Sequence, residues 1–183
     1  MRQVREIEVK YRVADLAALK RRLGVLGLDL SAPVHQDDQA YAENGWQYGM
    51  SKLGRSFARL RTQSGRHVFT LKRPTDNELA CLEYETGVDD REQMHQAILH
   101  MGFYPTVRIV KARHTARCGE LALCLDEVAH IGAFLEIEQV IGPERSGESV
   151  QAELDSFARS LGVGLERTTE TYDSLVRAVL VAT

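Results

Sequence analysis

Three segments of the chain carry two glutamates separated by one residue, and this spacing strongly constrains how the chain can fold. The segments are Glu6-Ile7-Glu8, Glu83-Tyr84-Glu85 and Glu136-Ile137-Glu138, and the first continues as Val9-Lys10. Side chains alternate between the two faces of a β-strand, so the first strand would have one apolar face and one ionic face. Any fold that accommodates such strands must place one of these faces inside.

The same alternation continues along most of the chain and predicts about eight strands. Strands are expected at 3–13, 56–63, 66–73, 80–88, 106–117, 120–128 and 133–141, with a weaker candidate at 38–43. Several of them are joined by tight connections, at Ser64-Gly65, Pro74 to Asn77, Cys118-Gly119 and Ala129 to Gly132. Short connections of this kind predict antiparallel neighbours.

Helical periodicity appears in four other segments. Helices are expected at 15–27, 90–101, 148–161 and 172–181. Asp15 is a candidate N-cap for the first helix, because its carboxylate can accept a hydrogen bond from the first turn. The first three helices end at Gly27, Gly102 and Gly162, and glycine suits a C-terminal cap. The mixture of strands and helices predicts an α+β protein formed by residues 1–183 as one domain.

Composition excludes some classes of function. The chain has 44% hydrophobic residues, enough for a packed core, and a net charge of -3, which argues against binding a nucleic acid polymer through a broad basic surface. No segment approaches the roughly 20 apolar residues that span a bilayer, so we expect a cytoplasmic protein that does not enter a membrane. In the irregular segment 42–57, Trp46 is expected in the core or an exposed loop rather than stacked on a base, while Lys52 and Arg55 are expected to be solvated.

Basic residues show the same spacing on other strands, as in Arg59-Leu60-Arg61, Thr70-Leu71-Lys72 and Lys111-Ala112-Arg113. For a single strand, the simplest interpretation is the solvent face of an antiparallel sheet. Here, however, acids and bases are sorted by strand. If the sheet closes into an eight-stranded barrel with helices packed outside, the charged faces line its interior. A charged interior needs charged contents, because unpaired buried ions are costly, and it therefore predicts water, metal ions and a polyanion.

These segments resemble a known family, the CYTH superfamily of triphosphate tunnel metalloenzymes. The resemblance is carried by Glu6 to Lys10, Arg59-x-Arg61, Thr70 to Lys72, Lys111-x-Arg113, Leu125 to Val128, Gly132 to Glu138 and Thr171 to Leu175. Within the superfamily, Val110 to Arg113 and Cys124 to Glu138 are most similar to the bacterial class IV adenylyl cyclases.

The resemblance implies a tunnel in which Glu8 and Glu136 hold a catalytic Mg²⁺ or Mn²⁺, with Glu6 and Glu138 assisting. It also implies a set of phosphate-binding residues: Lys10, Arg59, Arg61, Lys72, Lys111 and Arg113. The residues expected to act in catalysis are Glu8, Lys10, Lys72, Lys111, Arg113 and Glu136. Asp126 is interpreted either as a ligand of a second metal or as a residue that orients a basic side chain. Glu83 and Glu85 would tune the metal site or neutralise neighbouring arginines.

The expected function is a metal-dependent reaction on a triphosphate. The first hypothesis is an adenylyl cyclase that forms cAMP and pyrophosphate from ATP. The alternative is a triphosphatase that acts on tripolyphosphate, a nucleoside triphosphate or another organic triphosphate. A non-catalytic polyphosphate-binding module would need mainly cations, and a lipocalin-like carrier would need an apolar lumen. Relatives suggest a homodimer.

Overall fold

The alternating segments form one sheet of nine antiparallel strands that closes on itself. A computed structural model describes residues 5–182, so positions 3 and 4 of the first expected strand lie outside the described residues. The strands are β1 (Arg5–Val13), β2 (Val34–Glu43), β3 (Phe57–Gln63), β4 (Arg66–Asn77), β5 (Ala80–Val88), β6 (Phe103–Cys118), β7 (Leu121–Val128), β8 (Gly132–Ile141) and β9 (Leu165–Thr168). Their order is β5-β4-β3-β2-β6-β7-β8-β1-β9, and a further pairing between β5 and β1 closes β1 to β8 into the predicted barrel.

Strand β1 forms the seam of the barrel and has three partners. One edge pairs with β8 from Arg5, opposite Ile141, to Arg12, opposite Phe134. On the other edge, Arg5, Glu6 and Ile7 pair with β5, whereas Lys10 to Val13 pair with β9. The barrel is therefore closed at one end of β1 by β5, while β9 covers the edge at the other end.

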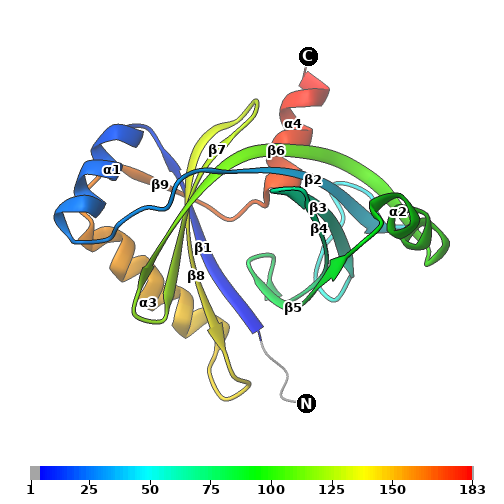
Figure 1. The fold of residues 1–183 in the computed structure, drawn as a ribbon. Helices are drawn as coiled ribbons and strands as arrows, with labels where there is room; N and C mark the ends of the chain where they lie inside the picture. The colour runs from blue at the N-terminus through cyan, green and yellow to red at the C-terminus, as the bar shows by residue number, and fades with distance from the viewer. Residues whose placement is uncertain (1–4, 183) are drawn as a thin grey trace.

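Four helices pack on the outside of the barrel (Figure 1): α1 (Leu16–Val25), α2 (Arg91–His100), α3 (Gly147–Ser160) and α4 (Tyr172–Ala182). The apolar residues of β1 and β8, such as Ile7, Val9 and Ile137, are fully buried in one cluster with residues of α1 and α3. Helix α2 covers β2 and β3 through Ile98, and α4 packs through Leu175 and Val176 on a cluster that includes residues of β6. The apolar strand faces thus point outward to the helices.

Several local predictions are confirmed. The Asp15 carboxylate accepts a hydrogen bond from the Ala18 amide at the start of α1, as expected for an N-cap. Gly27, Gly102 and Gly162 follow α1, α2 and α3 with positive φ angles of 70°, 92° and 66°, a conformation that glycine adopts without steric cost. Among the described residues, no helix is both long and apolar enough to cross a membrane.

Three details differ from the sequence prediction. The expected turn at Pro74 to Asn77 is wrong, because β4 continues to Asn77 with a register shift between Pro74 and Asn77, and the turn follows it. Strand β2 begins at Val34, earlier than position 38. Strand β9 was not predicted, since it has only four residues and is defined by its pairing with β1 rather than by a local pattern.

Candidate active site

The ionic strand faces enclose a cavity of about 300 Å³ inside the barrel. Its acidic lining residues are Glu6, Glu8, Asp38, Glu78, Glu83, Glu85, Glu136, Glu138 and Asp173. Its basic lining residues are Lys10, Lys52, Arg59, Arg61, Lys72, Lys111 and Arg113. All the residues predicted to bind phosphate therefore face one cavity, and the charged interior of the barrel is confirmed.

A cluster of three carboxylates lies on β1 and β8. Glu6, Glu8 and Glu138 each offer an oxygen atom, and these atoms all lie within 4.8 Å of one another. The sheet register causes the cluster, because Glu8 is the direct cross-strand partner of Glu138 and Glu6 lies on the same face of β1 as Glu8. Like charges opposite each other on two strands are destabilising unless a cation compensates them.

Burial and neighbouring carboxylates raise the pKa of each carboxyl group in this cluster. Lys72 lowers the pKa of Glu6, but burial and the Glu83 carboxylate outweigh it, so that the pKa is raised. Burial raises the pKa of Glu8 against the opposing effect of Lys10. Burial, followed by the carboxylates of Glu6 and Glu136, raises the pKa of Glu138 to about 8. A hard divalent cation with oxygen ligands, such as Mg²⁺ or Mn²⁺, fits this donor set because it would stabilise all three ionised carboxylates.

Glu136 lies beside this cluster but is already paired with cations. Lys10 Nζ lies 3.2 Å from the Glu136 carboxylate and 3.3 Å from that of Glu8. Arg113 donates a hydrogen bond to Glu136. Although burial favours the neutral acid, Lys10 and Arg113 hold the pKa of Glu136 well below its ordinary value. Glu136 therefore links the carboxylate cluster to the cations predicted to bind phosphate.

Asp126 is fully buried, and its carboxylate organises the basic residues. It accepts hydrogen bonds from Arg113 Nε at 2.7 Å, from Lys111 at 3.3 Å and from the Tyr172 hydroxyl at 2.9 Å. Burial and the neighbouring Arg113 lower the pKa of Lys111 to about 8. Of the two roles predicted for Asp126, these contacts support the orientation of basic residues.

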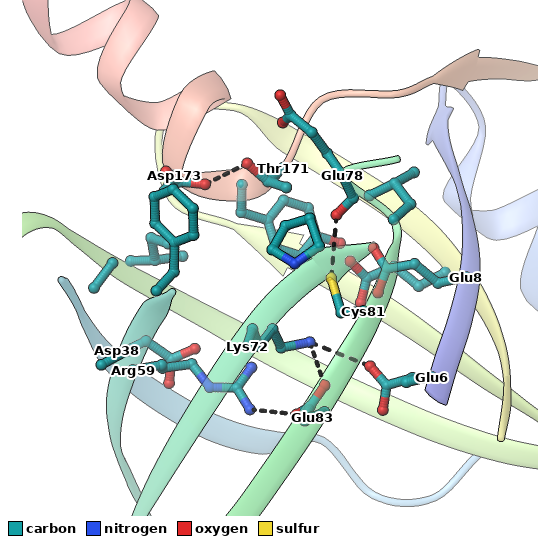
Figure 2. Close-up of a pocket in the computed structure, with 18 of the residues that line it drawn as sticks. Glu6, Glu8, Asp38, Arg59, Lys72, Glu78, Cys81, Glu83, Thr171 and Asp173 are labelled. Carbon is teal, nitrogen blue, oxygen red and sulfur yellow. Dashed lines mark hydrogen bonds and ion pairs between the residues drawn. The ribbon is translucent and has the colours of Figure 1, made fainter. Parts of the chain in front are cut away.

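Glu83 and Glu85 contact the cations of β3 and β4. Lys72 Nζ lies 2.6 Å from Glu83 and 3.2 Å from Glu6, and Arg59 lies 3.7 Å from Glu83 and 3.4 Å from Glu85. Figure 2 shows Lys72 between Glu6 and Glu83, with Arg59 beside Glu83. Burial disfavours ionisation of Glu83, but Lys72 and Arg59 outweigh it and lower its pKa. These contacts support the neutralising role predicted for this pair.

Asp38 is a lumen residue that the sequence analysis missed. It is 2% exposed, and its two carboxylate oxygens accept hydrogen bonds from Arg61 Nε and a terminal nitrogen, each at 2.7 Å. Such a two-point pair fixes the orientation of the guanidinium. The signal in the sequence was the position of Asp38 in the weak strand candidate. In the observed register, Asp38 lies directly opposite Arg61.

The prediction that Lys52 is solvated is wrong. Lys52 is only 5% exposed, and its ammonium group donates hydrogen bonds to Thr171 at 2.6 Å and Ser174 at 2.8 Å. It also lies 3.3 Å from Asp173 and 3.2 Å from Glu78. Lys52 thus joins the irregular segment between β2 and β3 to the start of α4. The signal for this burial was the polar sequence Thr171-x-Asp173-Ser174, which supplies partners for an ammonium group but is distant from Lys52 in the chain.

Trp46 lies in the core, which is one of the two positions expected for it, and is not among the residues that line the cavity. It is 2% exposed, its indole nitrogen donates to the Ser51 carbonyl at 3.2 Å, and Tyr48 and Phe57 pack edge-on against it. Arg55 is half exposed, in agreement with its predicted solvated position. The aromatic side chains that line the cavity are instead Tyr41, Phe57 and Tyr172.

An antiparallel barrel with outer helices and a lumen of sorted carboxylates and cations defines a tunnel protein with a charged interior. The family model described as the CYTH domain matches residues 4–172. The chain therefore belongs to the CYTH family, as the sequence analysis predicted.

The individual relatives have low sequence identity to this chain. The chain is 22% identical over 172 residues to "Adenylate cyclase CyaB" of Aeromonas hydrophila, covering 93% of this chain and 87% of the relative. The structure of the PH1819 protein from Pyrococcus horikoshii superposes with a TM-score of 0.79 at 21% identity, covering 94% of this chain and 98% of that protein. The structure of HpAC1 from Hippeastrum, described as having a dominant triphosphatase activity, gives a TM-score of 0.61 at 20% identity, covering 94% and 95%. At these identities the two structures share the fold with this chain.

Proposed function

We propose that the protein is a metal-dependent enzyme that binds a triphosphate group inside the barrel. The observation that carries the proposal is the carboxylate cluster of Glu6, Glu8 and Glu138 beside basic residues in the same cavity. Carboxylates suit a hard cation, whereas Arg and Lys suit phosphate oxygens. A phosphate sensor without catalytic activity would need the cations but not a crowded acidic cluster.

The lumen residues divide into two groups. Glu6, Glu8 and Glu138 would hold Mg²⁺ or Mn²⁺, with Glu136 next to them, and the bound ion would supply a Lewis acid for phosphoryl oxygens. Lys10, Lys111 and Arg113 come from the strands β1 and β6, whereas Arg59, Arg61 and Lys72 come from the strands β3 and β4. In this arrangement the basic side chains orient the triphosphate and stabilise the negative charge that develops on the departing group.

Adenylyl cyclase is our first candidate for the reaction, supported by the similarity to CyaB over most of the chain. In this reaction the ribose 3′-oxygen forms a bond to the α-phosphorus while the bond to pyrophosphate breaks. The basic side chains would stabilise the departing pyrophosphate.

A triphosphatase is the second candidate. The cations that line the cavity suit phosphate oxygens whatever organic group carries the phosphates. The triphosphatase activity described for HpAC1 gives additional support. In this reaction a water oxygen forms a bond to the γ-phosphorus while the bond from that phosphorus to the β,γ-bridging oxygen breaks, so that the diphosphate part leaves and orthophosphate is formed.

One experiment separates these candidates. Purified protein is incubated with ATP or tripolyphosphate in the presence of Mg²⁺ or Mn²⁺, and the products are resolved by chromatography. Formation of cAMP and pyrophosphate identifies the cyclase, whereas ADP or pyrophosphate with orthophosphate identifies the triphosphatase. If neither substrate is converted with either ion, the proposed enzyme function is refuted.

A further inference from the structure

Tyr172 is a buried aromatic residue that reaches the lumen from outside the barrel. It is the first residue of α4, and its side chain lines the cavity. Lys10 Nζ lies 4.3 Å from the centroid of its ring, and Lys111 Nζ lies 4.7 Å from the same centroid. One ring thus contacts two of the lysines that are expected to bind phosphate, although they come from different strands.

Both ammonium groups belong to buried side chains, since Lys10 is 2% exposed and Lys111 is 4% exposed. An ammonium group near the face of an aromatic ring is attracted by the ring quadrupole, more strongly when water is excluded. Unlike a carboxylate, the ring contributes no negative charge that would repel a phosphate oxygen. Lys10 and Lys111 already pair with carboxylates, so the ring adds a further contact that holds each lysine in place without adding negative charge.

The ring itself is fixed from two sides. The Tyr172 hydroxyl donates to Asp126 at 2.9 Å, and Asp126 also accepts from Lys111 and Arg113. Phe134 packs edge-on against the ring, with centroids 5.2 Å apart and an interplanar angle of 75°. These contacts leave the ring little rotational freedom, so the positions of the two ammonium groups relative to it are also restricted.

We propose that Tyr172 is a positioning residue that sets the placement of Lys10 and Lys111 for binding the triphosphate. This inference rests on the proposed function, because it assumes that the lumen binds a triphosphate. The essential feature of Tyr172 in this role is the π-face of its ring, which contacts both lysines. The hydroxyl group has the secondary role of orienting Asp126.

The test measures binding of tripolyphosphate with Mg²⁺ by isothermal titration calorimetry. Tyr172→Phe keeps the ring and should bind within about threefold of the unsubstituted protein, whereas Tyr172→Leu should bind about tenfold more weakly, as expected for loss of a desolvated cation–π contact. Leu175→Ala is the matched control, because it loosens the packing of α4 without touching either lysine, and its affinity should be unchanged. Circular dichroism and melting temperature report whether each variant is folded. If Tyr172→Leu does not fold, Tyr172→Met also removes the π-face, and its longer, flexible side chain of similar volume adapts better to the space that the ring leaves.

The outcomes separate the two proposals. If the unsubstituted protein does not bind tripolyphosphate, the proposed function itself is refuted. If it binds, and folded Tyr172→Leu or Tyr172→Met binds equally well, only the role of Tyr172 is refuted. The same conclusion follows if Tyr172→Phe binds as weakly as Tyr172→Leu, or if Leu175→Ala loses as much affinity as either.

Discussion

Glu138→Gln should stabilise the metal-free protein, although it removes a residue of the candidate metal site. In the folded, metal-free chain, burial and the neighbouring carboxylates raise the pKa of Glu138 from 4.5 to about 8. A carboxyl group with a raised pKa in the folded state costs nothing at low pH, where it is protonated in both states. As the pH rises above 4.5, the unfolded chain ionises first, so the free energy of unfolding falls until the pH passes the folded-state pKa.

The size of this effect follows from the shift. Each pKa unit corresponds to about 1.4 kcal/mol, and Glu6 and Glu136 share in the repulsion that raises the pKa of Glu138. We therefore expect the neutral amide of Glu138→Gln to raise the free energy of unfolding by about 1–3 kcal/mol near pH 7. The gain should be much smaller near pH 5, because Glu138 then carries its proton in the folded state and the unfolded-state cost has only begun to appear.

Urea denaturation in the presence of EDTA, measured near pH 5 and near pH 7, is the appropriate assay. Glu127→Gln is a matched control, because Glu127 is half exposed on β7 and lies outside the lumen. It should change the stability at either pH by less than about 0.5 kcal/mol. Addition of Mg²⁺ or Mn²⁺ should stabilise the unsubstituted protein more than Glu138→Gln. If Glu138→Gln gives no stability gain near pH 7, or the same gain at both pH values, then ionisation of the carboxylate cluster does not destabilise the folded protein and the reasoning is refuted.

Three further predictions concern other lumen residues. Glu136→Ala should abolish turnover of the triphosphate while circular dichroism shows a folded protein; unchanged turnover would contradict the predicted role of this residue. Lys52→Met should lower the free energy of unfolding by about 1–3 kcal/mol in urea denaturation, because it leaves partly buried acceptors at the start of α4 without their cation; Arg55→Met, at a half-exposed position in the same segment, should have little effect. Asp38→Asn should reduce the melting temperature, because Arg61 loses its charged partner; equal melting temperatures would contradict the importance of this pair.

The barrel and its charged lumen were predictable because both depend on a local property, the alternation of side chains along each strand. Glu6, Glu8 and Lys10 share a face whatever the strand pairs with, and the apolar residues between them need helices to cover them. The same pattern is ambiguous for an isolated strand. It became informative because acids and bases are sorted between strands over most of the chain.

The partners of individual charges were not predictable, because they depend on register and on segments that are distant in sequence. Lys52 lies in an irregular segment, and its burial depends on Thr171, Asp173 and Ser174 at the start of α4. The pairing of Asp38 with Arg61 depends on the register of β2 and β3. For the same reason the resemblance indicated Glu8 and Glu136 as the main metal ligands, whereas the structure brings carboxylate oxygens of Glu6, Glu8 and Glu138 within 4.8 Å of one another.

The seam at β1 also has a consequence for how the chain folds during synthesis. The first strand emerges early, but its partners β8 and β9 begin at Gly132 and Leu165. Pairings over such separations form slowly, because the intervening loop must close before any contact is gained. Until Thr168 has emerged, β1 has an unpaired edge between Lys10 and Val13, and Glu6 and Glu8 do not meet Glu138 until β8 is present. Assembly of the carboxylate cluster is therefore a late event, and a chain that ends before β9 would carry an exposed strand edge open to pairing with other chains.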